Sequence, residues 1–291
     1  MLNRVAIYSS GSNAKTTEVI KRLIEELCRN DIHVQLYEKS VEPGSCRGSM
    51  IEKFADLESL DEKPDLVISV GGDGTFLETM LKVRDLGIPV AGINTGRLGF
   101  LANISEDEII ASLEMLYKGD YEILSRSLLE ITEPSDLFND GSPVALNEIT
   151  IQKSDLSMIT INVHINGRYL NTYWADGIII STATGSTAYN LSTGGPILSP
   201  EDESIIISPI SPHNLTIRPI IVSGNSSLKL VVEGRSEEYL ATCDFRWKKL
   251  PFREQISIVR SSMKLKTVML NDRDFYGTLR SKLMWGADKR N

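Results

Sequence analysis

A stretch of nine residues, Val67-Ile-Ser-Val-Gly-Gly-Asp-Gly-Thr75, constrains the fold more than any other part of the chain. It places an apolar run, typical of a buried strand, directly before three glycines that surround one aspartate. A helical pattern over Thr75–Leu86 follows at once, so the chain must turn tightly from strand to helix. Such a unit is typical of a parallel sheet that is covered by helices.

The same turn also has a chemical interpretation. Glycines let the chain bring several amides close to a ligand, and these amides together with a helix N-terminus form a cradle for phosphate. Beside phosphates, the Asp73 carboxylate could take a proton from an attacking hydroxyl or help to hold Mg²⁺. A plain turn with Asp73 as a side-chain cap is the competing interpretation. A Walker loop is excluded because no lysine follows the glycines, and near Lys15-Thr16 the second required glycine is Ala14.

The first third of the chain alternates strand-like and helix-like segments, although residues 40–62 have no clear pattern. We therefore expect an α/β domain with a parallel, Rossmann-like sheet over residues 1–120. Its expected strands are Val5–Tyr8, Val34–Tyr37, Asp65–Val70 and Pro89–Ile93, and its first expected helix is Thr16–Asn30.

After about residue 120 the pattern becomes mostly β, and we expect a second, β-rich domain over residues 121–267. Asn166-Gly167 predicts a hairpin with a type I′ turn. Phe275, Leu279 and Leu283 recur at helical spacing and predict a closing helix within about residues 268–291, which could pack back on either domain. The expected strands are Ser127–Thr132, Ala145–Gln152, Met158–Ile165, Arg168–Trp174, Ile178–Ile180, Ile205–Ile207, Ile220–Val222, Leu228–Val232 and Ile256–Val259.

The composition limits the partners and the compartment. A formal net charge of −8 over 291 residues argues against a basic nucleic-acid footprint, so an anionic ligand has to be held locally. Cys28, Cys46 and Cys243 form neither a disulfide framework nor a C-x-x-C pair, which favours a reducing compartment. No signal peptide and no run of about 20 apolar residues is found. We expect a cytoplasmic protein with no membrane or nucleic-acid partner.

A second segment, residues 176–196, places an apolar strand before a run of hydroxyls and glycines with one aromatic residue. Hydroxyls and exposed amides suit the ribose and base edges of a nucleotide, and Tyr189 could lie against a ring. A Ser/Thr-rich loop with no ligand is the alternative. A nucleophile at Ser186 is a further alternative, but it lacks a G-x-S-x-G elbow and an obvious histidine partner.

Together these segments resemble the NAD kinase family. Gly71-Gly72-Asp73-Gly74-Thr75 resembles its GGDG signature, Asn147-Glu148 resembles its NE dipeptide, and residues 184–196 resemble its most distinctive signature. Asn94–Phe100 resembles the family's segment between the first two signatures. GGDG alone is a weak signal, because diacylglycerol and sphingosine kinases share it, whereas the three signatures in this order are specific.

This resemblance implies an N-terminal α/β domain, a C-terminal β-sandwich and an active site between them. It implies transfer of the γ-phosphoryl group of ATP, or of phosphate from inorganic polyphosphate, to the 2′-hydroxyl of the adenosine ribose of NAD, which gives NADP. It further implies a divalent cation such as Mg²⁺ and assembly into homodimers or homotetramers.

The resemblance also implies roles for individual residues. Asp73 would be the general base, Gly74 would contact the nucleotide through its backbone, and Phe100 would contact the adenine. Asn147 and Glu148 would hold the ribose and pyrophosphate parts of NAD. Without the family, Asn147 could cap a turn and Glu148 could be a solvated residue on a strand face.

The remaining implied residues belong to the second segment. Asp176 would reach the nicotinamide end of NAD, although it could also reflect turn chemistry alone, since it precedes a glycine. The adenine and ribose pocket would be lined by Thr187, Ala188, Tyr189, Asn190, Leu191 and Ser192.

Three positions depart from the family pattern. Trp174 stands where many relatives carry a basic residue, Glu78 stands at a position that is often basic, and Asp244-Phe245-Arg246 replaces an Asp-Gly-Gln-like segment. Arg246 could supply the positive charge that Trp174 lacks. These departures affect the rim of the expected site and leave the three signatures intact.

Two rival functions remain open at this point. A lipid kinase of the diacylglycerol type shares the glycine–aspartate turn, but no basic amphipathic stretch for membrane docking is apparent. A non-catalytic NAD(P)-sensing protein would keep the pocket over Thr187–Ser192 and would have no use for Asp73. Formation of NADP from NAD and ATP separates all three functions.

Overall fold

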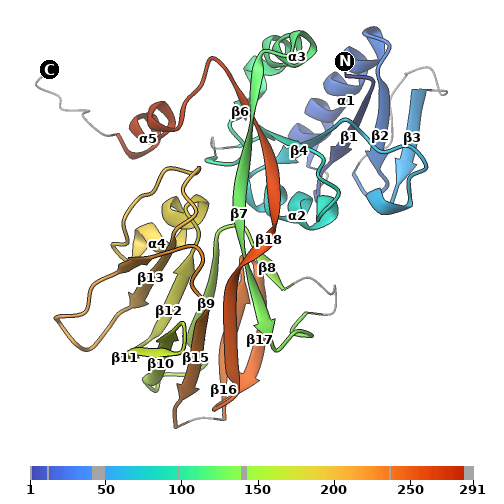
Figure 1. Cartoon of the computed structure of the whole chain (residues 1–291). Helices are drawn as coiled ribbons and strands as arrows, with labels where there is room; N and C mark the ends of the chain where they lie inside the picture. Colours follow the sequence, from blue (N-terminus) through green and yellow to red (C-terminus); the bar gives the residue numbers. More distant parts are fainter. Residues whose placement is uncertain are drawn as a thin grey trace, which may run out of the picture. The chain divides into compact units, whose positions relative to one another are not determined.

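The computed structural model describes residues 2–11, 13–40, 50–96, 99–138, 143–235 and 237–284. The chain divides into two compact units, of which unit 1 comprises Met1–Ser125 with Leu265–Asn291, and unit 2 comprises Arg126–Lys264. The sequence placed the boundaries at residues 120 and 267. The expected fold class, an α/β part and a β-sandwich part, is confirmed (Figure 1).

Unit 1 is built on a parallel sheet in the order β5-β4-β1-β2-β3, with β6 and the end of β18 beside β5. Apolar residues of α1 and α3 form one core with one face of this sheet. On the other face, Thr79 of α2 donates a hydrogen bond to Ser69 of β4. The strands are β1 (Arg4–Tyr8), β2 (His33–Tyr37), β3 (Ile51–Phe54), β4 (Leu66–Gly71), β5 (Val90–Asn94) and β6 (Ile104–Ser105).

The helices of unit 1 begin and end at recognisable signals. Asn13 caps α1 by accepting a hydrogen bond from the Thr16 amide, which confirms a plain helix start at this point. α2 ends at Val83 rather than at the expected Leu86, because Arg84 adopts a left-handed φ of 45°. The helices are α1 (Ala14–Arg29), α2 (Asp73–Val83), α3 (Ile109–Lys118) and α5 (Phe275–Leu283), with short 3₁₀ turns η2 (Leu57–Ser59) and η3 (Glu106–Glu108).

Unit 2 is an antiparallel β-sandwich. One sheet has the order β14-β13-β12-β9-β16-β17, and the other has the order β11-β10-β15-β18, with β7 pairing with β18 and β8. The elements are β7 (Tyr121–Glu133), β8 (Val144–Ala145), β9 (Glu148–Lys153), β10 (Ile159–Ile165), β11 (Arg168–Ala175), β12 (Gly177–Ser181), η4 (Thr184–Thr187), α4 (Tyr189–Ser192), β13 (Ile205–Ile210), β14 (Ile220–Val222), β15 (Leu228–Glu233), β16 (Glu238–Cys243), β17 (Arg246–Pro251) and β18 (Gln255–Leu270).

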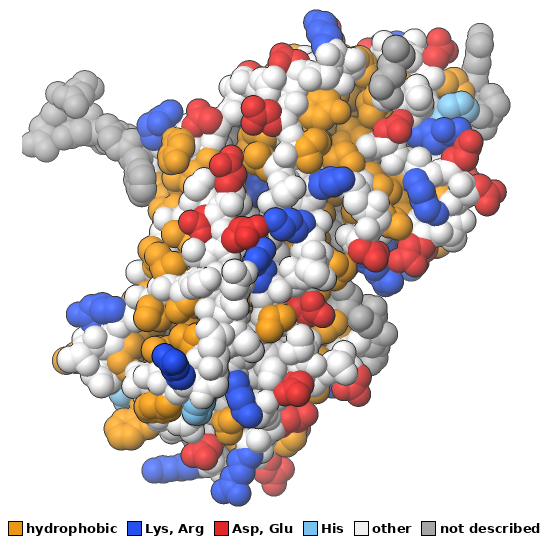
Figure 2. Space-filling model, in the orientation of Figure 1, with side chains coloured by type: hydrophobic (Ala, Val, Ile, Leu, Met, Phe, Trp, Pro, Cys, Tyr) orange, Lys and Arg blue, Asp and Glu red, His pale blue; other side chains and the backbone are white. Residues whose placement is uncertain are grey.

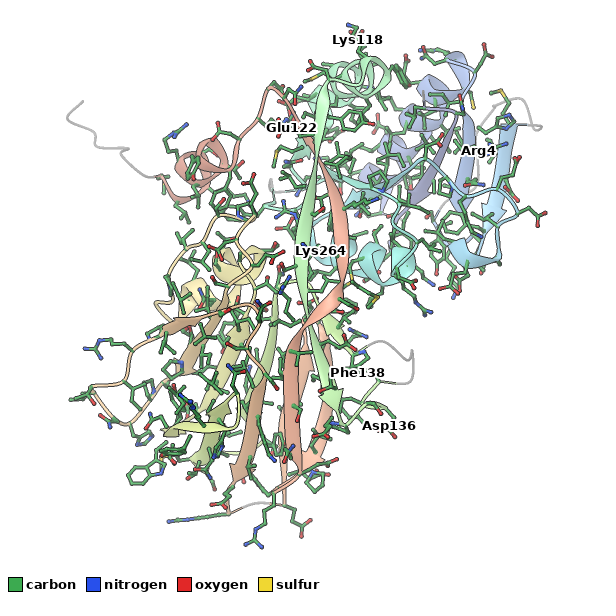
Figure 3. The ribbon with its side chains drawn as sticks, in the orientation of Figure 1. Arg4, Lys118, Glu122, Asp136, Phe138 and Lys264 are labelled. Carbon is green, nitrogen blue, oxygen red and sulfur yellow. The ribbon has the colours of Figure 1, made fainter. Side chains whose placement is uncertain are left out.

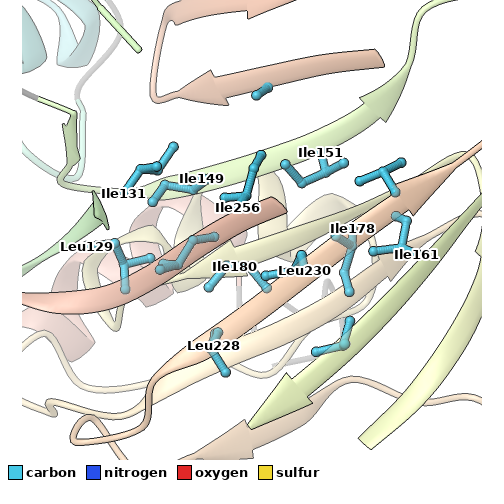
Figure 4. Packing of buried hydrophobic residues seen from close by; sticks show 14 of the residues in the cluster. Leu129, Ile131, Ile149, Ile151, Ile161, Ile178, Ile180, Leu228, Leu230 and Ile256 are labelled. Atoms are coloured by element: carbon cyan, nitrogen blue, oxygen red, sulfur yellow. The ribbon is translucent and has the colours of Figure 1, made fainter. Parts of the chain in front are cut away.

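Alternate residues of the strands in both sheets point inward and form one aliphatic core (Figure 4). Ile149 and Ile151 of β9 meet Ile161 of β10 and Leu230 of β15 in this core. The predicted hairpin between β10 and β11 is confirmed. Asn166 and Gly167 have φ values of 51° and 77°, as a type I′ turn requires.

Several expectations need correction. The single strand expected over Ala145–Gln152 is two strands, β8 and β9, because the amides between them bond to a side chain and not to a neighbouring strand. The unassigned residues 40–62 contain β3, and the sequence patterns missed α3, β16 and β17. The closing helix, α5, is shorter than expected, because β18 continues to Leu270; residues 285–291 lie outside the described residues.

Cysteine use also differs from the expectation. Cys28 is disulfide-bonded, whereas Cys243 is a free, buried thiol. Cys46 lies outside the described residues. In the part of the chain that the structure describes, no helix is both long and apolar enough to span a membrane.

Candidate functional site

The glycine-rich turn lies at the carboxyl end of β4, where ligands bind in open parallel sheets. Gly72 is the N-cap of α2 and provides no side-chain cap. An added Cβ at Gly71 would lie 2.3 Å from Thr75 Oγ1, whereas a Cβ at Gly72 or Gly74 would meet nothing within 4 Å. The space beside Gly72 and Gly74 is therefore open, and the first amides of a helix have no partner within the helix, as a phosphate cradle requires.

The Asp73 carboxylate does not cap its own helix but binds another loop of unit 1. Its Oδ1 accepts hydrogen bonds from the amides of Leu101 (3.1 Å) and Ala102 (2.9 Å), and its Oδ2 accepts one from the Phe100 amide (3.0 Å). A carboxylate has about four lone-pair directions, so one direction on Oδ2 remains for a proton or a ligand. The side-chain-cap interpretation of Asp73 is therefore wrong.

Gly99 allows this arrangement. A Cβ at this position would lie 1.8 Å from Asp73 Oδ1, so no other residue type fits beside the carboxylate as it stands. The segment Asn94–Phe100 and the glycine–aspartate turn are thus one structural unit. Arg97 and Leu98 of this segment lie outside the described residues.

Phe100 is half-buried, and the Lys282 ammonium of α5 lies over its ring at 4.4 Å from the ring centroid. Burial lowers the pKa of Lys282, while the nearby Asp73 carboxylate opposes this effect. The closing helix therefore brings a cation close to the turn. The sequence patterns missed Lys282 because helical spacing reports only the apolar side of α5.

Glu78 of α2, one of the departures from the family, also has a partner in unit 1. The Tyr8 hydroxyl donates a hydrogen bond to Glu78 Oε2 at 3.0 Å. Burial, and then the charge of Glu78, raise the pKa of Tyr8. Glu78 is thus held at the end of β1.

In unit 2, Asn147 lies in the break between β8 and β9, and Glu148 begins β9. Glu148 is only 8% exposed, so its interpretation as a solvated face residue is wrong. Its buried Oε2 has no hydrogen-bond partner among the described residues. Burial, and then the charge of the nearby Asp244, raise the pKa of Glu148 to about 8, against the effect of the Tyr189 amide. A buried acid with an unused oxygen is a strong candidate for ligand contact.

Asp244 is the residue next to this acid that the sequence analysis did not select. It lies in the turn between β16 and β17 with a left-handed φ of 53°. Its carboxylate accepts hydrogen bonds from the amides of Leu146 (2.8 Å), Asn147 (2.8 Å) and Glu148 (3.1 Å). Burial raises its pKa to about 6, against the effect of these three amides. The sequence analysis noted the segment Asp244-Phe245-Arg246 as a departure from the family pattern but gave its aspartate no role.

The segment 184–196 forms two helical turns, η4 and α4, rather than an open loop. Ser186 is fully buried, and its hydroxyl bonds to the backbone of Leu198, so it is not placed as a nucleophile. Asn190 is also fully buried, and its side chain bonds to Ser186, Pro196 and Ser208.

The other expected lining residues are more open. Tyr189 is 36% exposed and Ser192 is exposed, while Thr187, Ala188 and Leu191 are half-buried. Tyr189 therefore presents a ring to solvent in the same unit as Glu148, and its amide is one of the groups that act on the Glu148 carboxyl. Asn190, in contrast, holds the segment together.

Asp176 forms an ion pair with Lys153 of β9 at 2.6 Å. Trp174 is 55% exposed on β11. The Arg246 guanidinium donates a hydrogen bond to the Val144 carbonyl at 2.6 Å. It also lies 4.7 Å from the ring centroid of Phe138, which follows β7 (Figure 3). The cation that pairs with Asp176 is thus Lys153 and not Arg246.

Metal-ligating side chains do not gather in the described parts of the chain, where no group of three or more His, Cys, Asp or Glu could hold an ion. Mg²⁺ commonly takes one or two carboxylates and completes its shell with waters and substrate phosphates. The open direction on Asp73 Oδ2 beside the amide cradle is compatible with that mode. On the face shown in Figure 2, basic and acidic side chains are interspersed.

A parallel α/β unit with a glycine-rich turn and a fixed carboxylate, in one chain with a β-sandwich that carries a buried acid, is typical of a kinase for a small molecule. The model of the ATP-NAD kinase N-terminal domain matches residues 11–121, and that of the ATP-NAD kinase C-terminal domain matches residues 146–270. The chain therefore belongs to the ATP-NAD kinase family, which confirms the resemblance of its signatures.

Relatives cover the chain from end to end. It is 42% identical over 299 residues to the NAD kinase of Flavobacterium psychrophilum, with 99% of this chain and 100% of the relative covered. It is 46% identical over 227 residues to the NAD kinase of Bacteroides fragilis, with 78% of each covered.

Two solved structures share the fold. One is an NAD kinase from Archaeoglobus fulgidus in complex with ATP, with a TM-score of 0.74, 26% identity and coverage of 96% of this chain and 99% of that chain. The other is yeast NADH kinase complexed with NADH, with a TM-score of 0.84, 23% identity and coverage of 99% and 89%.

Proposed function

We propose that this protein transfers the γ-phosphoryl group of ATP to the 2′-hydroxyl of the adenosine ribose of NAD, which gives NADP. The observation that carries the proposal is the placement of Asp73. Its carboxylate is fixed by three amides beside an open amide cradle, and one direction on Oδ2 is left to accept a proton. That is the arrangement that a general base needs for attack on a bound phosphoryl group.

In this mechanism unit 1 binds ATP, the phosphoryl donor. The amides that open α2, including that of Gly74, bind phosphate oxygens, and Asp73 takes the proton of the attacking hydroxyl. Phe100 contacts the adenine of NAD. Because phosphoryl transfer depends mainly on positioning and charge stabilisation, the rigidity of the 99–102 loop contributes as much as the carboxylate itself.

Unit 2 handles NAD. Asn147 and Glu148 hold its ribose and pyrophosphate parts, and Asp176, oriented by Lys153, reaches the nicotinamide end. The ring of Tyr189 and the half-buried residues around it line the adenine and ribose pocket. Asn190 acts by holding this pocket in shape, since its side chain is buried. Arg246 contributes through the Val144 carbonyl that it binds.

A divalent cation, with Mg²⁺ as the expected ion, would neutralise the charge that develops on the phosphates when it is bound. The proposal has it arrive with the triphosphate, because metal ligands are not clustered in the described residues. Inorganic polyphosphate is an alternative donor that the same amide cradle would accept. We further propose that the chain works in the cytoplasm as a homodimer or homotetramer.

One assay tests the function. The protein is incubated with ATP, Mg²⁺ and either NAD or diacylglycerol, and NADP is measured with an NADP-specific dehydrogenase. We expect NADP from NAD and no phosphorylated lipid. NAD binding without product would favour a sensor, and a phosphorylated lipid would favour the diacylglycerol kinase function. Light scattering during size-exclusion chromatography checks the assembly state.

A further inference from the structure

Leu146 and Asn147 form the break between β8 and β9, and Glu148 begins β9. The backbone of this tripeptide has an unusual set of partners. All three amides donate to the Asp244 carboxylate, at 2.8, 2.8 and 3.1 Å. The Leu146 carbonyl accepts from Thr182 Oγ1 at 2.6 Å, and the Asn147 carbonyl accepts from the Thr182 amide at 2.9 Å. The Glu148 carbonyl accepts from the Asp244 amide at 3.0 Å. Two residues thus satisfy the whole backbone of this tripeptide.

We propose that Asp244 and Thr182 are positioning residues for the dinucleotide, because they hold the backbone from which the Asn147 and Glu148 side chains project. The inference rests on the proposed function in assigning NAD as the ligand. Neither residue needs to touch NAD. Each acts through the tripeptide, whose first two residues lie between β8 and β9 and belong to neither strand.

Asp244 is suited to this task by its position. It is half-buried, and a left-handed φ of 53° turns the chain so that its amide and its carboxylate both face the tripeptide. Aspartate is among the few residue types other than glycine that adopt this conformation readily. Hydrogen bonds to an ionised carboxylate are shorter and stronger than those between neutral groups, so the three amides are firmly fixed.

Thr182 connects the tripeptide to the second ligand segment. Its Oγ1 donates to the Leu146 carbonyl and accepts from the Gly185 amide at 3.0 Å. Gly185 packs so closely that an added Cβ would lie 2.0 Å from the Asn147 carbonyl oxygen. One buried hydroxyl therefore sets the distance between Asn147-Glu148 and the 184–196 segment.

Asp244 also acts on the charge of Glu148. The groups that act on the Glu148 carboxyl are the Asp244 carboxylate, which raises its pKa, and the Tyr189 amide, which lowers it. Arg246 in turn faces Asp244 and favours its charged form. If Asp244 only stabilised the fold, replacing it would leave the pH dependence of KM for NAD unchanged. If Asp244 also sets the environment of Glu148, replacing it shifts that pH dependence.

The test uses Thr182→Val, Thr182→Ser and Asp244→Asn in the full chain. KM for NAD and KM for ATP are measured separately, together with the melting temperature. We expect Thr182→Val to raise KM for NAD by about tenfold or more, because the bond to the Leu146 carbonyl is lost, while KM for ATP stays within about twofold. Thr182→Ser keeps the hydroxyl and should restore KM for NAD.

The pH profile gives a second, independent result. Asp244→Asn removes the neighbouring charge that raises the pKa of Glu148, so the inflection in KM for NAD should move to lower pH. The matched control is Asp65→Asn, since Asp65 likewise accepts two amides, those of Asn3 and Arg4, at 2.7 and 2.9 Å. The control should lower the melting temperature and leave both KM values unchanged.

A folded Thr182→Val or Asp244→Asn protein with wild-type KM for NAD and an unmoved pH profile would overturn the positioning role, whatever its melting temperature. If Thr182→Val does not fold, Thr182→Ala carries the same test. If the wild-type protein makes no NADP, the proposed function fails first. Equilibrium binding of NAD to the same variants then decides whether the two residues position a dinucleotide.

Discussion

Gly99→Ala should displace the Asp73 carboxylate without changing its chemistry. An added Cβ at Gly99 would lie 1.8 Å from Asp73 Oδ1, 2.5 Å from Cγ and 2.9 Å from Oδ2. Because non-bonded carbon and oxygen atoms need at least about 3 Å, the carboxylate and the loop must separate by more than about 1 Å. Hydrogen bonds that now measure 2.9 to 3.1 Å would then exceed their geometric limit.

The size of the effect follows from these three bonds. A hydrogen bond to a charged group contributes about 1.5–3 kcal/mol net, but the carboxylate is only partly buried and water recovers much of that energy. We expect the free energy of unfolding to fall by about 2–4 kcal/mol in total. A misplacement of about 1 Å at a reacting group costs about 10²-fold in rate, so kcat should fall by at least that factor.

Urea unfolding and NADP formation measure the two effects on the same preparation. Gly96→Ala is the control from the same loop, because its Cβ would lie 3.7 Å from Asn94 Oδ1, an ordinary contact. Its free energy of unfolding should stay within about 0.5 kcal/mol of wild type. Should Gly99→Ala match the wild type in both stability and kcat, the Asp73 carboxylate is not pinned to the 100–102 amides, and the reasoning fails.

Three further substitutions give separate tests. Asp73→Asn keeps Oδ1 but places an amide group opposite the Phe100 amide. We expect kcat to fall by about 10²–10⁴-fold and the free energy of unfolding to fall by about 1–2 kcal/mol. Near-normal turnover would show that Asp73 is not the general base. Gly74→Ala adds a better helix former at a position where nothing lies within 4 Å of the new Cβ. Urea unfolding should show a free energy of unfolding that is higher by about 0.5–1 kcal/mol, while KM for ATP rises. An unchanged KM for ATP would place the phosphates elsewhere. In the wild type, burial first and then the charge of Asp244 raise the pKa of Glu148 to about 8. The folded state therefore keeps a proton that the unfolded chain releases. The free energy of unfolding should fall by up to about 1.4 kcal/mol per pH unit as the pH rises from 6 to 8. Glu148→Gln should lose this slope in urea titrations, and an equal slope in the variant would assign the proton to another group.

Much of the fold could be predicted because the core follows simple periodicities. The strands of the parallel sheet are short apolar runs, and β10 alternates buried and half-buried residues before a turn that only Asn-Gly-like pairs form readily. The α5 helix was visible in three apolar residues at helical spacing. In contrast, β17 was missed because it is exposed along most of its length and has no apolar period.

The candidate site could be predicted only in part. Glycine spacing identified the cradle, and the family signatures identified Glu148, yet neither indicated that Glu148 is buried with an unused oxygen. Lys153, Lys282 and Asp244 were all missed. Their partners lie far away in sequence, as the separation of 96 to 98 residues between Asp244 and its three amides illustrates, so no local pattern could report them.

The two aspartates share one structural device that bears on how substitutions in this protein should be interpreted. Asp73 binds the amides of three consecutive residues, 100 to 102, and Asp244 binds those of residues 146 to 148. Each carboxylate fixes the backbone of a short segment, so replacing it disturbs the segment as well as the acid. Loss of activity in Asp73→Asn alone therefore cannot distinguish a general base from a loop anchor. Gly99→Ala separates the two roles, because it keeps the Asp73 carboxylate and breaks its bonds to the loop. Similar losses of kcat in both variants would show that the position of the carboxylate matters as much as proton transfer. A far smaller loss of kcat in Gly99→Ala would assign the chemistry to the carboxylate itself.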